Sequence, residues 1–171
     1  SEVTESSPRE TITLCVCTYK RPIGVRRALE SLAACEKPAN RRVRILVVDN
    51  DPAASAKPVV ESFRSVHWGL QVCYVPEPLP GIAAARNRCI AESVGHWVAF
   101  IDDDEHVHAK WLIELLAVQA ATGADVIFGP VEPLFEGPVP PWVVRSDAYA
   151  RRRHGTGSTI NWRETRTGNV L

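Results

Sequence analysis

The chain has 171 residues, of which 45% are hydrophobic and 23% are charged, which is enough to bury the core of one globular domain. Twenty Lys and Arg residues balance twenty Asp and Glu residues, so no overall positive field draws this chain to nucleic acid. A charged ligand must therefore be bound by a local cluster of side chains.

Cysteine usage and hydropathy indicate a reducing, aqueous environment. The five cysteines form no C-x-x-C pair and lie mostly in apolar segments, where free thiols pack as small hydrophobic groups. No apolar run approaches the roughly 20 residues that span a bilayer, and residues 1–10 form a polar tail unlike a signal peptide. These features predict a soluble protein.

Five short apolar runs predict strands, at residues 11–17, 42–48, 70–75, 97–101 and 125–128. Between them, helical spacing of apolar residues predicts helices over 25–33, 54–64, 82–94 and 112–116. Strands that alternate with helices indicate a doubly wound α/β fold, in which helices cover both faces of a mainly parallel sheet. Beyond Gly129, five prolines in 16 residues predict a loop with edge pieces, and the final TGNVL resembles the start of a strand.

Ligands of such sheets bind at the carboxyl ends of the strands, so the residues there carry most information. The sequence FIDDDE at 100–105 runs from an apolar strand into four acidic residues. Unit charges about 4 Å apart repel by several kcal/mol at an effective dielectric constant of about 20, so a cation is expected nearby. Mg²⁺ and Mn²⁺ take such carboxylates together with substrate phosphate. The alternative is an acidic turn in which Asp104 or Glu105 caps the next helix.

Three further clusters follow strands or begin helices. In VVDND at 47–51, Asp49 can accept hydrogen bonds from a nucleobase or ribose, or else form an Asx turn with Asn50 and Asp51. In CTYKRP at 17–22, Thr18 and Tyr19 offer hydroxyls and an aromatic face, and the next two residues, Lys20 and Arg21, offer positive charge.

The third cluster is PGIAAARNRCI at 80–90, whose predicted apolar helix face consists of Ile82, Ala85, Cys89 and Ile90. At ~100° per residue, Arg86 falls within this face and Arg88 falls outside it. An inward guanidinium needs an anion, which is either a strand-end acid in a structural pair or a bound phosphate.

Taken in order, CTYKRP, VVDND, PGIAAARNRCI, FIDDDE, WLIELL, ADVIFGPV and TGNVL resemble the pattern of the family 2 inverting glycosyltransferases, closest to the subgroup of bacterial succinoglycan-type glucosyltransferases. The resemblance covers residues 11–171 and implies a GT-A (Rossmann-like) fold. It divides the chain into the tail 1–10, a nucleotide-sugar-binding domain at 11–130 and the start of an acceptor-side region at 131–171.

The resemblance also implies the activity and the site. It predicts metal-dependent transfer of a sugar from a nucleotide-diphosphate donor, such as a UDP-sugar, to a saccharide or lipid-linked acceptor, in exopolysaccharide or cell-surface glycan synthesis. The protein would be cytoplasmic, with peripheral association at the inner face of the bacterial plasma membrane. The implied nucleotide-binding residues are Thr18, Tyr19, Arg21, Asp49, Arg86, Asp102 and Asp103. The implied ligands of Mn²⁺ or Mg²⁺ are Asp104 and Asp102.

The general base is not visible in this pattern. Family members carry it in a G-G-E-D-like stretch after the segment that TGNVL begins, so the resemblance places it beyond Leu171. The later acids of this chain, Glu132, Glu136, Asp147 and Glu164, have no matching context. Two alternatives therefore remain: a non-catalytic nucleotide-sugar-binding module, and a nucleotidyltransferase, although CTYKRPIG is poor in the glycines that a phosphate loop needs.

Overall fold

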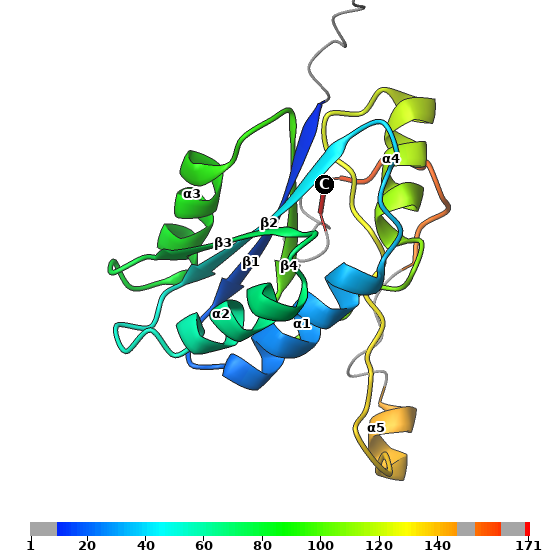
Figure 1. The fold of residues 1–171 in the computed structure, drawn as a ribbon. Coiled ribbons are helices and arrows are strands. Elements are labelled where there is room, and N and C mark those ends of the chain that lie inside the picture. The colour runs from blue at the N-terminus through cyan, green and yellow to red at the C-terminus, as the bar shows by residue number, and fades with distance from the viewer. Residues whose placement is uncertain (1–9, 147–152, 162–169) are drawn as a thin grey trace, which may run out of the picture.

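The computed structural model describes residues 10–146, 153–161 and 170–171, and within them one parallel sheet forms the centre of the fold. Its strands are β1 (Thr11–Thr18), β2 (Arg42–Asp49), β3 (Gln71–Pro76) and β4 (Trp97–Asp102), in the order β3-β2-β1-β4 (Figure 1). Along β1, Cys17 pairs with Val48 of β2 on one side and with Asp102 of β4 on the other. The carboxyl ends of these three strands therefore lie side by side.

Helices cover both faces of the sheet, as the sequence predicts. The helices α1 (Pro22–Ala34), α2 (Lys57–Val66) and α4 (Trp111–Thr122) cover one face, and α3 (Ile82–Glu92) covers the other (Figure 1). Because side chains alternate along a strand, Leu14 and Val16 are buried on the first face, whereas Cys15 and Cys17 are buried beneath α3. The prediction of a doubly wound α/β fold is confirmed.

The prediction of a fifth strand at residues 125–128 is wrong, because in the described part of the chain this segment does not pair along its length with another strand. Residues 125–128 form a single antiparallel bridge, between Phe128 and Val170, and Val170 also bridges Phe100 of β4. A strand needs a partner along its length, and the described residues opposite this segment are 170 and 171 alone. The pairing of Val170 agrees with the predicted start of a strand in TGNVL, whose first three residues lie outside the described part.

The segment after residue 129 contains one short helix, α5 (Pro141–Arg145), where the prolines predict a loop. Pro141 stands at its first position, where a proline ring has a suitable φ and the missing N–H leaves no hydrogen bond unmade. In Figure 1, α5 lies at the end of an extended segment, away from the sheet. The division of the chain near residue 130 stays a prediction.

Candidate nucleotide and metal site

The adjacency of β1 and β4 joins two clusters that lie far apart in the sequence. Thr18 ends β1, and its Oγ1 donates a 2.8 Å hydrogen bond to Oδ2 of Asp103, which directly follows β4. Both residues are buried. The carboxylate of Asp103 therefore faces inward, and the buried hydroxyl of Thr18 fixes its orientation.

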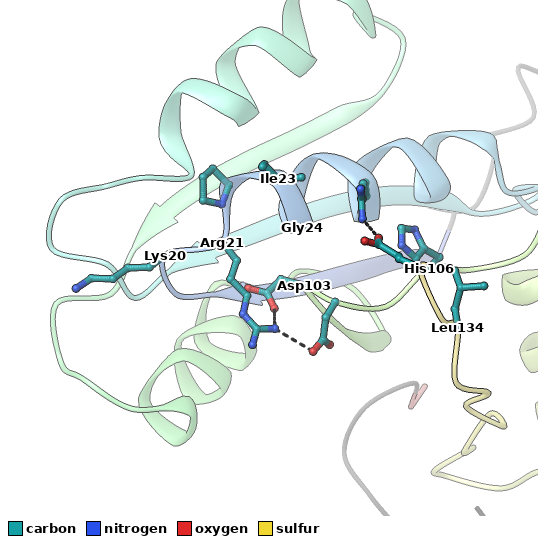
Figure 2. Close-up of a pocket in the computed structure, with 11 residues that line it drawn as sticks. Lys20, Arg21, Ile23, Gly24, Asp103, His106 and Leu134 are labelled. Atoms are coloured by element: carbon teal, nitrogen blue, oxygen red, sulfur yellow. Dashed lines mark hydrogen bonds and ion pairs between the residues drawn. The ribbon is translucent and has the colours of Figure 1, made fainter. Parts of the chain in front are cut away.

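Arg21 supplies the positive charge that the acidic run requires. Its Nη1 lies 3.4 Å from Oδ1 of Asp103 and 2.9 Å from Oδ2 of Asp104, and Figure 2 shows the guanidinium directed at Asp103. The Asp104 side chain is 65% exposed, whereas that of Asp103 is 11% exposed. Burial raises the pKa of Asp103, although the hydrogen bond from Thr18 and the charge of Arg21 oppose this rise.

The helix-capping alternative for the acidic run is wrong. The residue before α4 is Lys110, and no side chain caps this helix. Glu105 instead accepts a 3.1 Å hydrogen bond from the backbone N–H of Asp102, which closes the acidic turn on itself. The acids are therefore held by the turn and by arginines, and none of them serves the next helix.

Gly24 in the first turn of α1 allows the acidic turn to approach the helix closely. A Cβ atom at this position would lie 2.3 Å from the backbone oxygen of Asp103, which is far inside van der Waals contact. Glycine is therefore required here for its small size, because the clashing atom belongs to the backbone. The start of α1 and the acidic turn form one closely packed unit.

Arg86 projects from α3 toward the end of β4. Its Nη2 lies 3.1 Å from Oδ1 of Asp102, so the predicted pairing with a strand-end acid is present. The predicted apolar face of α3 is too wide, because Ala85 and Cys89 are buried whereas Ile82 and Ile90 are 58% and 59% exposed.

The narrower face changes the placement of the two arginines of α3. A contact stripe centred on Ala85 and Cys89 puts Arg86 on one flank and Arg88 on the other, each about 80° from its centre. Arg88, like Arg86, is partly buried, and it lies 2.9 Å from Glu92 and 4.0 Å from Glu77, so the prediction that only Arg86 lies within the buried face is not confirmed.

Asp49 is buried at 1% exposure, and its carboxylate accepts hydrogen bonds from within the chain. The donors are the backbone N–H groups of Asp51 and Ala56, each at 3.0 Å, and the hydroxyl of Tyr74 at 3.1 Å. Burial, together with the negative charge of Asp49, raises the pKa of Tyr74 to about 12. The turn alternative is therefore present, and a contact between Asp49 and a nucleobase stays a prediction.

Asn50 organises the site in a way that the sequence patterns did not indicate. Its amide donates to the backbone oxygens of Glu77 and Leu79 at 2.8 and 2.7 Å, and its oxygen accepts the N–H of Gly81 at 2.8 Å. This one side chain ties the end of β2 to the loop that leads into α3. An amide within an otherwise acidic turn, VVDND, is the signal that would have indicated it.

Tyr19 and Lys20 of the motif CTYKRP lie at the surface. Tyr19 is 53% exposed, and the ammonium of Lys20 lies 5.0 Å from the centre of its ring. In Figure 2, Lys20 extends away from Asp103. Tyr19 therefore presents an accessible aromatic face near the strand ends, as a base-stacking role requires.

A pocket of about 370 Å³ opens beside the acidic turn (Figure 2). Arg21 and Gly24 line it from the side of α1, Asp103 from the turn, and His106 and Leu134 from later segments. An ion pair between Arg27 and Glu136 joins α1 to the segment after residue 130. The pocket thus lies between the acids and the region that the sequence assigns to the acceptor.

The acidic turn fits a divalent cation through the chemistry of its donor atoms. Asp102 and Asp104 offer hard carboxylate oxygens, and Mg²⁺ in nucleotide sites typically takes one or two carboxylates plus phosphate oxygens. In the described part of the chain, no group of three or more His, Cys, Asp or Glu residues is arranged to hold a metal. A cation at this turn would need ligands from a second molecule, and a diphosphate provides them.

Solved structures with the same fold belong to GT-A glycosyltransferases. S. aureus TarS 1-349 superposes with a TM-score of 0.64 at 22% identity, covering 76% of this chain and 38% of that chain. The mannosyltransferase PcManGT from Pyrobaculum calidifontis, in complex with GDP-Man and Mn²⁺, gives a TM-score of 0.60 at 22% identity, covering 67% and 33%. The four-stranded parallel sheet with its polar strand ends therefore defines a GT-A fold.

Sequence comparison supplies the family. A model described as Glycosyl transferase family 2 matches residues 13–167, and the chain belongs to this family. The succinoglycan biosynthesis protein ExoM of Rhizobium meliloti (strain 1021) is 38% identical over 162 residues, which are 90% of this chain and 52% of ExoM. The glycosyltransferase AglE of Haloferax volcanii is 26% identical, over 71% of this chain and 39% of AglE. The chain thus spans about half of ExoM, or less of other relatives.

The helices of the described residues are short or polar. None of them is long and apolar enough to cross a bilayer.

Proposed function

We propose that this chain is the donor-binding part of a metal-dependent glycosyltransferase that transfers a sugar, with inversion, from a nucleotide-diphosphate donor to a saccharide or lipid-linked acceptor. One observation carries the proposal: Thr18, Arg21 and Arg86 converge with the acidic turn 102–104 at one edge of the sheet. This edge is where α/β folds bind nucleotides.

The names of similar proteins support the finer details. ExoM is named for succinoglycan biosynthesis, which supports a role in exopolysaccharide or cell-surface glycan synthesis. A second TarS structure contains UDP-GlcNAc and gives a TM-score of 0.62, and the PcManGT structure contains GDP-Man and Mn²⁺. These ligands support a nucleotide-sugar donor, which we take to be a UDP-sugar, together with Mn²⁺ or Mg²⁺.

The residues at this edge of the sheet would have different roles in donor binding. Asp104 and Asp102 would hold the cation, which when bound supplies positive charge to the leaving nucleoside diphosphate. Arg21 is close enough to both Asp103 and Asp104 to neutralise them before the donor arrives and is exposed enough to reach a phosphate. Thr18 holds Asp103 at the edge of the sheet, and Tyr19, which follows Thr18, offers its exposed aromatic ring to the nucleobase.

The acceptor is assigned to the part of the same pocket that Leu134 and Glu136 line, next to the donor-binding Arg21. The segment that contains Leu134 and Glu136 borders this pocket, and it starts the region that follows the donor-binding domain. Glu136 pairs with Arg27 and Glu132 pairs with Arg153, so neither acid is proposed as the base. Asp147 and Glu164 lie outside the described residues. Following the family pattern, the proposal places the base beyond Leu171.

Two parts of the proposal concern cellular context. A lipid-linked acceptor would bring the protein to the inner face of the bacterial plasma membrane as a peripheral, cytoplasmic enzyme. Family membership gives no support to the nucleotidyltransferase alternative. A non-catalytic module would bind the same donor, and it is distinguished by the absence of sugar transfer to an acceptor.

Thermal unfolding with nucleotides tests the proposal. UDP or a UDP-sugar should raise the stability only when Mn²⁺ or Mg²⁺ is present, by about 2.7 kcal/mol at a ligand concentration of 100 times Kd. Equal stabilisation by UDP in excess EDTA would refute the role of the metal. No stabilisation by any nucleotide, with or without the cation, would refute donor binding itself.

The variant Asp104→Asn tests whether the acidic turn is responsible for the metal-dependent stabilisation by nucleotide. This variant should fold normally, with a change of about 1 kcal/mol or less without ligand, because the pair with Arg21 is exposed. It should lose the metal-dependent stabilisation by nucleotide. The matched control is Glu114→Gln, which removes an exposed acid from α4 and should bind as the parent protein does.

A further inference from the structure

Three thiols gather beneath α3. Cys15 and Cys17 project from the same face of β1, and Cys89 lies opposite them on α3. All three are buried, with at most 6% exposure. The Sγ atoms of Cys17 and Cys89 are 3.5 Å apart, which is van der Waals contact between two free thiols. The donor-binding function proposed above uses none of these sulfur atoms.

The pair of thiols lies directly beside the residues that would bind the donor. Cys17 precedes Thr18 in the chain and is the register partner of Asp102 in β4. Cys89 lies three residues after Arg86, so the two side chains are neighbours on the surface of α3. A link between these two cysteines would tie α3, which carries Arg86, to β1, the strand that pairs with β4 at Asp102.

We propose that Cys17 and Cys89 are a site of oxidative modification, where hydrogen peroxide forms a disulfide that moves Arg86 relative to Asp102 and weakens donor binding. The formation of the disulfide does not depend on the proposed function. The weakening of donor binding by the disulfide does rest on that function.

The chemistry needs one equivalent of hydrogen peroxide. The thiolate of one cysteine attacks a peroxide oxygen, the O–O bond breaks, and hydroxide leaves and takes up the released proton as water. The sulfenic acid that forms is attacked by the second thiol, so that the S–S bond forms, the S–O bond breaks and a second water leaves. Two thiols are oxidised to one disulfide, and the peroxide is reduced to two waters.

The geometry indicates which element moves. A disulfide requires an S–S distance of about 2.0 Å, so the sulfur atoms must approach by about 1.5 Å from their present separation. β1 is hydrogen-bonded to neighbours on both sides, whereas α3 contacts the sheet through the narrow stripe of Ala85 and Cys89. The helix is therefore the element that shifts, and it carries Arg86 with it.

Cys15 is the internal competitor for Cys89. Hydrogen bonding from Cys89 lowers the pKa of Cys15, and the same hydrogen bonding, together with burial, raises the pKa of Cys89. The thiolate form, which attacks peroxide, is therefore favoured at Cys15, so a link between Cys15 and Cys89 is the competing product. An experiment must distinguish the sulfur atoms of Cys15 and Cys17.

Disulfide mapping by mass spectrometry tests the bond. The protein is treated with peroxide, blocked with N-ethylmaleimide and digested with trypsin without reduction. Cys15 and Cys17 share the tryptic peptide 10–20, so fragment spectra must assign the sulfur that is linked to peptide 89–110. We expect a link between Cys17 and Cys89 that dithiothreitol reverses. A link through Cys15, a link between two molecules, or no link would overturn the inference.

Matched variants and a nucleotide titration test the consequence. Oxidation should weaken UDP binding in Mn²⁺ about tenfold, the loss expected when one charge-assisted hydrogen bond is displaced. Cys17→Ala and Cys89→Ala should each abolish the effect, whereas Cys15→Ala and Cys73→Ala should retain it. Unchanged affinity of the mapped disulfide form would overturn the coupling to Arg86. If the disulfide forms but the reduced protein binds no nucleotide, the proposed function fails while the modification site stands.

Discussion

Arg86 of α3 and Asp102 at the end of β4 form an ion pair at the carboxyl edge of the sheet, with Nη2 3.1 Å from Oδ1. The side chains are 22% and 39% exposed, so the pair is partly shielded from solvent. This contact connects the helix on one face of the sheet to the first acid of the proposed metal cluster.

Arg86→Lys should weaken the binding of UDP with Mn²⁺ about tenfold while the protein remains folded. Lysine keeps the charge but lacks the planar fork that holds a carboxylate, so Asp102 loses its fixed orientation. Isothermal titration calorimetry measures the affinity. Arg88→Lys is the matched control, because Arg88 lies on the same helix and pairs with Glu92 at its surface. Equal losses in the two variants would contradict a specific role of Arg86.

The buried carboxyl of Asp103 should impose a pH dependence on stability. Because burial raises its pKa in the folded protein, the folded state binds this proton more tightly than the unfolded state does. The contribution of Asp103 to the free energy of unfolding is therefore fully present below the ordinary aspartate pKa of 3.8, and it is lost as pH rises through the raised pKa.

Asp103→Asn should remove that loss and make the ligand-free protein more stable at neutral pH. Asparagine keeps an oxygen that accepts the hydrogen bond of Thr18 but carries no buried charge. Urea unfolding across the acidic to neutral range measures the effect. Glu114→Gln, at an exposed position on α4, should leave the shape of the profile unchanged. Parallel profiles for Asp103→Asn and the parent protein would show that this carboxyl does not cause the pH dependence.

Gly24→Ala should disturb the acidic turn directly. The added Cβ would meet the backbone oxygen of Asp103 at 2.3 Å, so either α1 or the turn must move, at a cost of about 1–3 kcal/mol. Denaturant unfolding measures the loss, and binding of UDP with Mn²⁺ should weaken in parallel. Gly69→Ala is the control, since a Cβ at Gly69 meets nothing within 4 Å. Parental stability and binding in the Gly24→Ala variant would show that the turn is not held by this contact.

The sequence was sufficient for the four strands of the sheet and for the edge at which the site lies. Apolar runs such as that of β4, when they alternate with helices, indicate buried strands of a parallel sheet. The carboxyl ends of such strands meet at one edge. The acids after β4 and the polar residues after β1 were therefore expected at the same edge of the sheet, and the 2.8 Å contact of Thr18 with Asp103 lies at that edge.

What the sequence could not supply depends on strand order and on contacts between distant segments. The pairing of Arg21 with Asp104 needs β1 beside β4, and periodicity within either strand does not encode that order. The exposure of Ile90 depends on how much of α3 the sheet covers, which a helical repeat alone does not determine. The thiol contact of Cys17 with Cys89 has the same origin, since it joins segments 72 residues apart.

Asn50 offers the sharpest test of how the donor site is built. Its three hydrogen bonds hold the loop 77–81, and Gly81 at the end of that loop has a φ of 116°, which a residue with a side chain rarely adopts. Without the amide, the backbone oxygens of Glu77 and Leu79 lose their donor and the start of α3 loses its anchor. Asn50→Ala should therefore destabilise the protein by about 1–3 kcal/mol in urea unfolding.

Asn50→Asp should weaken nucleotide binding although the two side chains are nearly the same size. A carboxylate cannot donate to the two carbonyl oxygens and repels them. The loop should then open, and amide hydrogen exchange at Gly81 should accelerate. Asn87→Ala, at an exposed position on α3, provides the matched control and should change neither exchange nor affinity. If Asn50→Asp lowers stability but leaves the exchange at Gly81 and the affinity for UDP with Mn²⁺ unchanged, Asn50 stabilises the fold without positioning the site.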